Sequence, residues 1–325
     1  MTKTQAVRFH RTGGPEVLQL EEVSVGDPGP GEARVRHTAI GLNFIDTYQR
    51  SGLYRVQLPA TGGNEGAGVV EAVGAGVDAV RPGDRVAYTG HLGAYCERRL
   101  VPADRLVVLP AGISDEQAAA VMLKGLTVQY LIHRTYRVQP GDAVLWHAAA
   151  GGVGLFACQW LRALGATVIG TASTDEKTAL ARAHGAHHAV NYTREDFVER
   201  VRGLTGGRGV PVAYDSVGKS TWEGTLECLR PLGLAVFFGN ASGPVPPLDI
   251  ALLAQKGSLY VTRPMLYTYT ASRADLEASA RSLFEAVSSG AVRVEVGARY
   301  RLADVERAHR DLEGRRTTGS AILLP

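Results

Sequence analysis

Hydrophobic residues between Asp142 and Pro264 gather in short runs that alternate with amphipathic stretches. Six runs rich in β-branched or aromatic residues predict strands: AVLWHAAA, TVIGTAS, HAVNY, VPVAYDSVG, LAVFFGN and SLYVTRP. The stretches between them predict helices: GLFACQWLRALG, DEKTALARAHG, EDFVERVRGLTGG, STWEGTLECLRPLG and DIALLAQKG. Helices ending at Gly165, Gly185 and Gly233 would carry the usual C-terminal glycine. Strands joined by helices imply right-handed crossovers, so the pattern predicts an α/β, doubly wound parallel sheet with helices on both faces.

The flanking regions have a different pattern. Before about residue 125, short alternating runs such as ARVRHTAIGLN and GVVEAVGAGV are broken by GDPGPGE, PATGGNEG and RPGDRV, which is typical of turn-rich β structure. After the α/β region, ADLEASARSLFEAVSSGAV predicts a helix, and VEVGARYRL and GSAILLP predict strands. We therefore expect a β-rich domain over 1–125, the α/β domain over 126–264, and a segment 265–325 that returns to complete the β-rich domain.

One nineteen-residue run, Ala143 to Leu161, contains no Asp, Glu, Lys or Arg and has the hydropathy of a membrane span. Its glycines, however, fall where the first strand should turn into the first helix. The segment Ala149 to Gly154 fits the GxGxxG fingerprint with alanine in the first place, a turn whose backbone can approach a pyrophosphate at a helix N-terminus. A tight packing turn without a ligand is the alternative. The place of the turn at the head of six strands favours a dinucleotide site made by Ala150, Gly151, Gly152, Val153 and Gly154, and a membrane span is rejected.

The end of the second predicted strand indicates which dinucleotide binds. An acid about twenty residues past the glycines would bind the ribose 2′-OH of NAD, but the sequence there is GTASTDEK. Ser173, Lys177 and the nearby Tyr192 suit the 2′-phosphate of NADPH better than a bare diol. Against this, Asp175 and Glu176 lie close by, and Lys177 could be a solvated helix residue.

Charge and signal sequences exclude some classes of protein. The net charge of +3 is small for 325 residues, and no cluster of Lys and Arg marks a surface for nucleic acid or lipid. The N-terminus MTKTQAVRFH lacks a secretory signal, so a cytoplasmic location is expected.

Cysteine and histidine spacing gives no metal or redox motif. Cys96, Cys158 and Cys228 have no CxxC spacing and are interpreted as reduced, packed thiols; a nucleophilic role is the disfavoured alternative. His184, His187 and His188 are interpreted as surface histidines because Gly185 interrupts the helix that an i, i+4 ligand pair requires.

Several longer stretches add a family resemblance. They are GGPEVL, IGLNFIDTYQRSGLY, GGNEGAGVVEAVG, LKGLTVQYL, HAAAGGVG, YDSVG, FGNASG and QKGSLYVTRP. Together they resemble the NADPH:quinone oxidoreductases, the ζ-crystallin-like group of the zinc-independent medium-chain dehydrogenase/reductase superfamily. The resemblance covers the whole chain and implies a GroES-like β-rich catalytic domain joined to a Rossmann domain.

The zinc ligands of the zinc-dependent relatives are missing from this sequence. The stretch GLNFID has no Cys, and GGNEGAG has Asn64 where those relatives have the His of GHE. An amide is a poor zinc ligand beside imidazole or thiolate, and closely spaced cysteines for a structural zinc are absent. We expect a metal-free protein.

The resemblance also implies the site residues. Asn43, Tyr54 and Thr127 would line the nicotinamide and substrate cleft between the domains, although Tyr54 could instead pack only against Leu58 and Pro59. Beyond the glycine turn, the implied coenzyme-binding residues are Ser173, Lys177, Tyr192, Ser216, Phe238, Gly239, Asn240, Ser242 and Arg263.

Without a Lewis acid, an easily reduced acceptor is expected. We therefore predict an NADPH-dependent reductase of small-molecule quinones. A reductase of enal or enone double bonds is the first alternative, which needs a proton donor that neither Tyr54 nor Tyr130 can be assigned from sequence. An RNA-binding or structural, crystallin-like role is the second, and the missing basic cluster argues against it. The last strand of the series, SLYVTRP, would be a sheet edge; relatives pair there, so a homodimer is expected.

Overall fold

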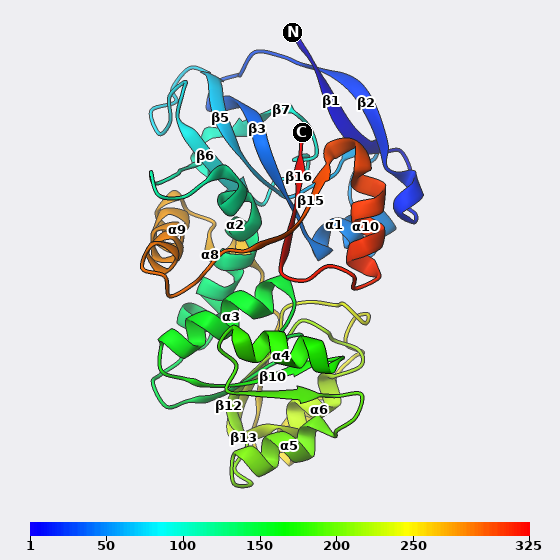
Figure 1. Cartoon of the computed structure of the whole chain (residues 1–325), viewed down its shortest axis with the longest axis vertical. Coiled ribbons are helices and arrows are strands. Elements are labelled where there is room, and N and C mark those ends of the chain that lie inside the picture. The colour runs from blue at the N-terminus through cyan, green and yellow to red at the C-terminus, as the bar shows by residue number, and fades with distance from the viewer. The chain divides into compact units, whose positions relative to one another are not determined.

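The computed structural model describes all 325 residues, and the chain divides into two compact units. The first unit consists of Met1–Leu126, Thr270–Ser288 and Val294–Pro325, and the second of Thr127–Tyr269 and Ser289–Arg293. Figure 1 traces the elements of each unit by residue number. No helix in the structure combines the length and the apolar character that crossing a membrane requires.

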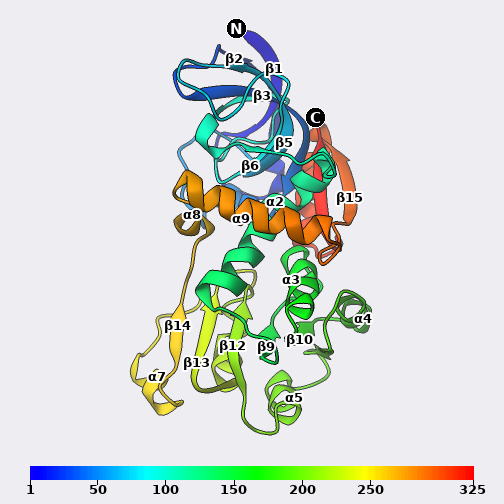
Figure 2. The same cartoon turned by 90° about the vertical axis from the view of Figure 1, so that its left-hand side faces the viewer.

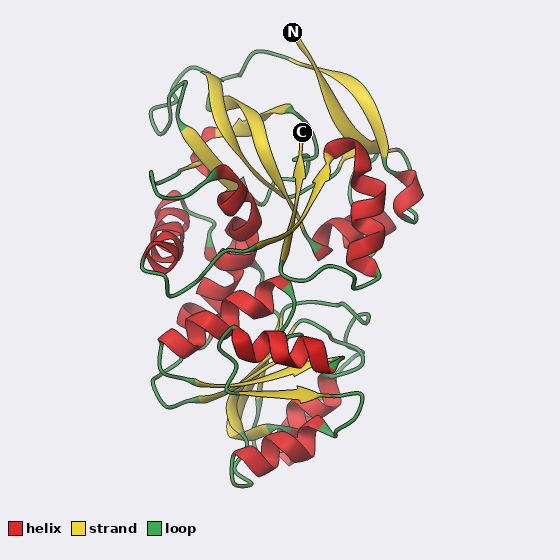
Figure 3. Cartoon of the chain, in the orientation of Figure 1, coloured by secondary structure: helices red, strands yellow, loops and turns green.

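The second unit contains a six-stranded parallel sheet with the strand order β11-β10-β9-β12-β13-β14. Figure 2 shows β14 at one edge of this sheet, and Figure 3 shows helices above and below it. The strands are continuous apolar runs because both faces are covered; all six residues of β12 are buried. The strands are β9 (Ala143–Trp146), β10 (Thr167–Ala172), β11 (His188–Asn191), β12 (Val210–Asp215), β13 (Leu229–Phe237) and β14 (Tyr260–Thr262). The helices are α3 (Gly152–Ala163), α4 (Asp175–Ala183), α5 (Phe197–Leu204), α6 (Trp222–Glu227), α7 (Ala251–Gln255) and α8 (Leu266–Tyr269).

This sheet confirms the predicted fold class, with one helix boundary corrected. Gly165 and Gly185 follow α3 and α4 with φ angles of 80° and 107°, as expected of C-terminal glycines. The helix predicted to end at Gly233 is wrong, because α6 ends at Glu227 and Gly233 lies inside β13. Pro231 cannot continue a helix, and the segment around it pairs with β12 instead.

The first unit is built mainly on antiparallel strands. One sheet has the order β15-β16-β3-β5-β6-β8, with β7 also paired to β3, and a smaller sheet has the order β2-β1-β4. The strands are β1 (Thr2–Phe9), β2 (Gln19–Val25), β3 (Glu32–Leu42), β4 (Ala60–Thr61), β5 (Glu65–Val73), β6 (Arg85–Thr89), β7 (Arg98–Pro102), β8 (Val107–Val108), β15 (Val296–Arg301) and β16 (Ser320–Leu324). The helices are α1 (Phe44–Ser51), α9 (Arg273–Ser288) and α10 (Val305–Glu313), and α2 (Asp115–Tyr130) begins in this unit and ends in the second. Strand β16 pairs antiparallel with β3, so the end of the chain joins strands from its beginning.

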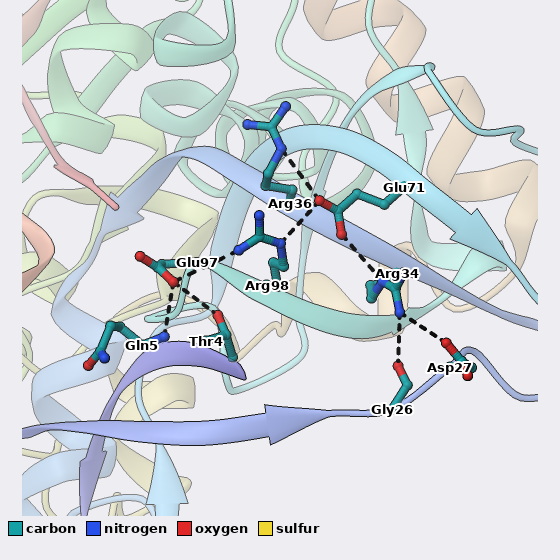
Figure 4. A network of polar contacts seen from close by, with 9 residues as sticks. All are labelled: Thr4, Gln5, Gly26, Asp27, Arg34, Arg36, Glu71, Glu97 and Arg98. Atoms are coloured by element: carbon teal, nitrogen blue, oxygen red, sulfur yellow. Dashed lines mark hydrogen bonds and ion pairs between the residues drawn. The ribbon is translucent and has the colours of Figure 1, made fainter. Parts of the chain in front are cut away.

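The exposed side of the first unit carries a network of ion pairs, drawn in Figure 4. Strand β3 alternates buried and accessible residues, which puts Arg34 and Arg36 on the accessible side. Their Nε atoms lie 3.3 and 3.5 Å from the carboxylate of Glu71, and Nε of Arg98 lies 3.1 Å from it. Accessible ion pairs of this kind contribute little to stability. The network links Glu71 on β5 to arginines on β3 and β7.

Candidate functional site

The glycine turn of the second unit leaves no room for a side chain at Gly154. Strand β9 ends at Trp146, and α3 begins at Gly152 with Gly151 as its N-cap. A Cβ atom on Gly154 would lie 2.4 Å from the carbonyl oxygen of Ala148, so any side chain there would displace the turn. The first N–H groups of a helix have no partner within the helix and can hold an anion. Gly154 thus lets α3 pack closely against the segment after β9, and the first N–H groups of α3 are the part of the turn that could hold a phosphate.

The ends of β10 and β11 bring Ser173 and Tyr192 to neighbouring positions. The two strands pair in parallel up to Ala172 and Asn191, and the next residues are Ser173 and Tyr192. The hydroxyl of Thr174 caps α4 by accepting a hydrogen bond from the N–H of Lys177 at 3.2 Å. Lys177 is half-buried and Tyr192 is exposed at its ring. Ser173 and Tyr192 therefore follow neighbouring strands at the carboxyl end of the sheet, and Lys177 lies in the first turn of α4.

Hydrogen bonds join the loop after β12 to the loop after β13. The N–H of Ala241 donates to the carbonyl of Ser216 at 3.1 Å, and the Ser242 hydroxyl donates to the carbonyl of Val217 at 2.8 Å. A Cβ atom on Gly239 would lie 2.5 Å from the Ser216 carbonyl oxygen. The predicted coenzyme residues at these two strand ends are Ser216, Phe238, Gly239, Asn240 and Ser242, and Arg263 directly follows β14. All the predicted residues of the second unit except Thr127 therefore lie in the loop, or in the first turn of the helix, that follows a parallel strand. This is the edge at which α/β sheets bind ligands.

A buried polar network that the sequence reasoning missed supports these loops. The carboxylate of Asp215 accepts hydrogen bonds from the N–H groups of Val217 and Gly218 at 2.7 and 2.9 Å, and from the Thr225 hydroxyl at 2.7 Å. The Thr225 oxygen lies 3.1 Å from Nε2 of His147, the residue just after β9. Burial lowers the pKa of His147, which favours the neutral imidazole. Because the Thr225 hydroxyl donates its proton to Asp215, its oxygen accepts from the Nε2–H of His147. The network thereby joins the loop after β12 to the start of the glycine turn.

In the first unit, Asn43 presents one buried acceptor with no hydrogen-bond partner. Asn43 precedes α1 and is 4% exposed. Its Nδ2 donates to the Glu65 carboxylate at 2.8 Å, and its backbone N–H donates to Asp46 at 2.8 Å. Its Oδ1 is buried and unpaired. Since the amide donor is committed to Glu65, the side chain offers an acceptor, which matches a ligand that brings an N–H or O–H.

Glu65 is itself fixed by two residues of α2. Its other oxygen accepts the N–H of Leu123 at 2.6 Å, and the Lys124 ammonium lies 3.7 Å from the carboxylate. Burial raises the pKa of Glu65, and Lys124 and the hydrogen bonds oppose that rise. The spacing of Glu65 and Lys124 along the chain does not reveal that they pair. The one sequence signal for a functional Glu65 was an acid directly after Asn64 within the glycine-rich GGNEGAG stretch.

Asp46 lies at the head of a second buried chain of polar contacts. It accepts hydrogen bonds from Nδ2 of Asn64 at 2.7 Å and from the Tyr95 hydroxyl at 2.8 Å. Burial raises the pKa of Asp46 to about 6. The Tyr95 oxygen lies 3.0 Å from Nε2 of His309 on α10, and Nδ1 of His309 lies 3.1 Å from the Arg50 guanidinium. These contacts fix α1, and with it Asn43, against α10.

The other two predicted catalytic residues, Tyr54 and Thr127, lie in an aromatic contact and in a buried helix position. The Tyr54 ring contacts that of Tyr48 edge-on, with centroids 5.3 Å apart, so Tyr48 is an aromatic neighbour that sequence reasoning missed. Thr127 is buried in α2. Tyr130, on the same helix, is also buried, and burial raises its pKa, which makes it a weaker proton donor.

No group of three or more His, Cys, Asp or Glu side chains is arranged to hold a metal ion. Asn64 is buried, and its amide is engaged with Asp46 and with Gln49. The three cysteines are free and buried, which confirms their interpretation as packed thiols, and burial raises the pKa of each thiol to about 12. Thiols with such pKa values are poor nucleophiles.

Both parts of the chain are similar to known proteins. Residues 29–111 match the family model described as alcohol dehydrogenase GroES-like domain, and residues 152–285 match the one described as zinc-binding dehydrogenase. The quinone oxidoreductase of Pseudomonas aeruginosa is 56% identical over 98% of this chain and 99% of its own length. A 2-haloacrylate reductase from a Burkholderia species is 46% identical over 98% of both chains.

A solved structure is similar over its whole length. It is that of Escherichia coli quinone oxidoreductase complexed with NADPH, which has a TM-score of 0.97 and 50% sequence identity over 99% of this chain and 100% of that one. The chain therefore belongs to the quinone oxidoreductase family of the medium-chain dehydrogenase/reductase superfamily.

Proposed function

We propose that this protein is a zinc-independent, NADPH-dependent quinone reductase, which transfers reducing equivalents from NADPH to quinones. The observation that carries the proposal is the glycine turn, where the backbone of Ala148 excludes a Cβ atom on Gly154 at the head of a six-stranded parallel sheet. The family supplies the acceptor class, because several members that are at least half identical to this chain are named quinone oxidoreductases.

The residues present fit NADPH. Backbone N–H groups from Ala150 to Gly154 would hold the pyrophosphate, and Ser173, Lys177 and Tyr192 would surround the 2′-phosphate. The loops after β12, β13 and β14 would hold the rest of the coenzyme through Ser216, Phe238, Gly239, Asn240, Ser242 and Arg263. Bound NADPH supplies the hydride that reduces the acceptor.

Asn43, Thr127 and Tyr54 would serve the reacting groups. The unpaired Oδ1 of Asn43 would accept a hydrogen bond from the nicotinamide carboxamide, whose orientation decides which face of the ring is offered. Thr127 would orient the same ring through its hydroxyl. Tyr54, braced by Tyr48, would bound a flat acceptor. Positioning is the main contribution expected of the chain, since a quinone needs no polarising metal.

A second candidate function is the reduction of activated carbon–carbon double bonds. It is favoured by one observation, the 46% identity to a 2-haloacrylate reductase. Such a reaction needs a placed proton donor for the carbon next to the activating group. Tyr130 is unsuited to that role because it is buried and its pKa is raised.

Two further properties belong to the proposal. The exposed edge of β14, where the Tyr260 side chain is 61% exposed, is proposed to pair with a second copy to form a homodimer. A cytoplasmic location is proposed as well, and the three free, buried cysteines are consistent with it. Neither a membrane nor a nucleic acid is proposed as a partner.

The decisive experiment is steady-state oxidation of NADPH against a panel of benzoquinones, naphthoquinones, enals, saturated ketones and alcohols. Turnover with quinones and little with ketones or alcohols is expected. Turnover of enals without turnover of quinones would replace the main proposal with the double-bond reductase. Size-exclusion chromatography with light scattering tests the dimer.

A further inference from the structure

Asp175 stands where an acid would decide the choice of coenzyme. It is the first residue of α4 and follows the end of β10 by three positions, two residues after Ser173 and two residues before Lys177. An acid near this strand end binds the ribose 2′-OH in NAD-dependent proteins and repels the 2′-phosphate of NADPH. The presence of Asp175 therefore conflicts with the proposed preference for NADPH.

The structure shows that both carboxylate oxygens of Asp175 are occupied by the protein. Oδ1 accepts a hydrogen bond from Nδ2 of Asn191 at 2.7 Å, and Oδ2 accepts one from the Arg194 guanidinium at 2.5 Å. Asn191 is the last residue of β11 and is 6% exposed, so its amide is held in place. Its Oδ1 accepts from the N–H and the hydroxyl of Thr193 at 3.1 and 2.7 Å, which fixes which end of the amide faces Asp175.

Arg194 balances the charge at the start of α4. Asp175 and Glu176 bring two negative charges to the start of α4, and Lys177 brings one positive charge. Arg194 reaches Asp175 from the turn after β11, where its N–H donates to the carbonyl of Asn191 at 3.0 Å. Its guanidinium adds the second positive charge, so the region has no net negative charge toward a phosphate.

The Arg194–Asp175 ion pair is too exposed to matter much for folding. Its side chains are 69% and 60% exposed, and such pairs contribute between zero and about 1 kcal/mol to stability. A small contribution to stability does not limit the effect of the ion pair on the affinity for a charged ligand that binds beside it. A phosphate with a charge between about −1.5 and −2 senses every nearby carboxylate that is not neutralised.

We propose that Arg194 and Asn191 sequester the Asp175 carboxylate, and that this sequestration sets the preference for NADPH over NADH. Arg194 is thus a specificity-determining residue that acts through Asp175, by neutralising its charge and occupying one of its two oxygens. The inference rests on the proposed function, since it concerns the coenzyme site of that reductase.

The test measures equilibrium binding, not turnover. Dissociation constants for NADP⁺ and NAD⁺ are determined by isothermal titration calorimetry for the unaltered protein, Arg194→Gln, Asp175→Asn and the double variant. Arg194→Gln should weaken NADP⁺ about three- to tenfold and leave NAD⁺ unchanged or bound more tightly, an effect that shrinks as salt is raised. The double variant should recover NADP⁺ affinity to within about twofold of the unaltered protein, because the charge that Arg194 neutralises is gone.

Arg200→Gln is the matched control. Arg200 lies on α5, its Nε is 2.8 Å from the carboxylate of Glu195, and its side chain is 55% exposed. It should change neither dissociation constant. All these positions are exposed, so thermal melting is expected to stay within a few degrees for each variant.

Three results would overturn the inference. Equal weakening of both coenzymes by Arg194→Gln, or no weakening of NADP⁺, would show that Arg194 does not govern the preference. Selective weakening that the double variant fails to restore would make Arg194 a direct phosphate ligand. If the unaltered protein bound neither NADP⁺ nor NAD⁺, the proposed function would fail together with the inference, which distinguishes that case from the other two.

Discussion

Asp215 in the second unit and Glu65 in the first are both fully buried acids, yet they are stabilised differently. Asp215 accepts hydrogen bonds from two backbone N–H groups and from the hydroxyls of Thr221 and Thr225, all of them neutral donors. Glu65 faces the Lys124 ammonium at 3.7 Å and accepts one backbone N–H and one amide. A buried charge held by neutral donors depends on geometry, whereas one held by a cation depends on the presence of its partner.

The sequence separation of the partners differs as well. All the hydrogen-bond donors to Asp215 lie within ten residues of it. Glu65 and Lys124 are far apart in the chain, and in the same unit Arg50 is paired with Glu313 at 2.6 Å across 263 positions. The site of the second unit is therefore supported locally, and that of the first unit depends on the whole unit being folded.

Replacing Lys124 with Met should have the largest effect, because it leaves Glu65 buried without its cation. The free energy of unfolding at neutral pH should fall by about 3–5 kcal/mol, measured by urea denaturation. Adding Glu65→Gln to Lys124→Met should recover part of this loss, since the uncompensated charge is then removed. A loss below about 1 kcal/mol for Lys124→Met would mean that Glu65 is not stabilised by that cation.

The raised pKa of Asp46 should make the stability of the protein depend on pH. Burial raises its pKa from 3.8 to about 6 in the folded protein, so the folded state holds a proton that the unfolded state has already lost between these values. Its contribution to stability is therefore fully present below pH 3.8 and is lost as the pH rises through about 6. The loss amounts to about 3 kcal/mol.

Asp46→Asn should abolish that part of the pH dependence. Unfolding free energies of the variant and the unaltered protein, measured at several pH values between about 4 and 7, isolate Asp46 because Glu65 is present in both. The difference between the two proteins should shift in favour of the variant as the pH rises. A constant difference over this range would contradict the raised pKa.

In the second unit, Gly154→Ala should damage both folding and coenzyme binding. The new Cβ would lie 2.4 Å from the Ala148 oxygen and 2.6 Å from that of Ala149, both of them backbone atoms that cannot turn aside. Overpacking of this kind costs about 1–3 kcal/mol, and the displaced turn should bind NADP⁺ at least about tenfold more weakly.

Gly203→Ala is the matched control for Gly154→Ala. Gly203 lies in α5, and a Cβ atom there would have nothing within 4 Å. Alanine should be neutral or stabilise the protein by about 0.4–1 kcal/mol, without any change in coenzyme binding. Equal behaviour of the two variants would show that close packing at Gly154 does not shape the turn.

The second unit could be predicted well because its signals are local. The parallel strands are short, mostly apolar runs, and the glycine turn spans six residues. Hydrophobic periodicity and glycine spacing were therefore enough to predict the series of strands and the position of β14 at the sheet edge. The failure came at Gly233, where a helical pattern and a glycine suggested a longer helix. Strand pairing with β12 prevailed over that local signal.

The contacts of the first unit could not be derived in the same way. Asn43 was named from the family resemblance, but its unpaired Oδ1 and the partners Asp46 and Glu65 follow only from tertiary contacts. His309 lies on α10, for which no helix was predicted, and reaches Tyr95 from more than two hundred residues away. Spacing along the chain carries no information about such pairs. The predicted roles of Asn43, Tyr54 and Thr127 remain predictions.

The smallest expected effect is that of removing metal. One family model that matches the chain is described as zinc-binding dehydrogenase, yet Asn64 replaces the histidine expected of a zinc-dependent relative and gives its amide protons to Asp46 and Gln49. A zinc ion would need these amides to become ligands, which is unfavourable beside thiolate or imidazole. Elemental analysis of purified protein should find no stoichiometric zinc, and treatment with a chelator should leave both the melting temperature and the rate of NADPH oxidation unchanged. About one zinc per chain, with activity lost on chelation and regained on adding zinc, would instead place metal chemistry in the first unit and refute the argument from Asn64.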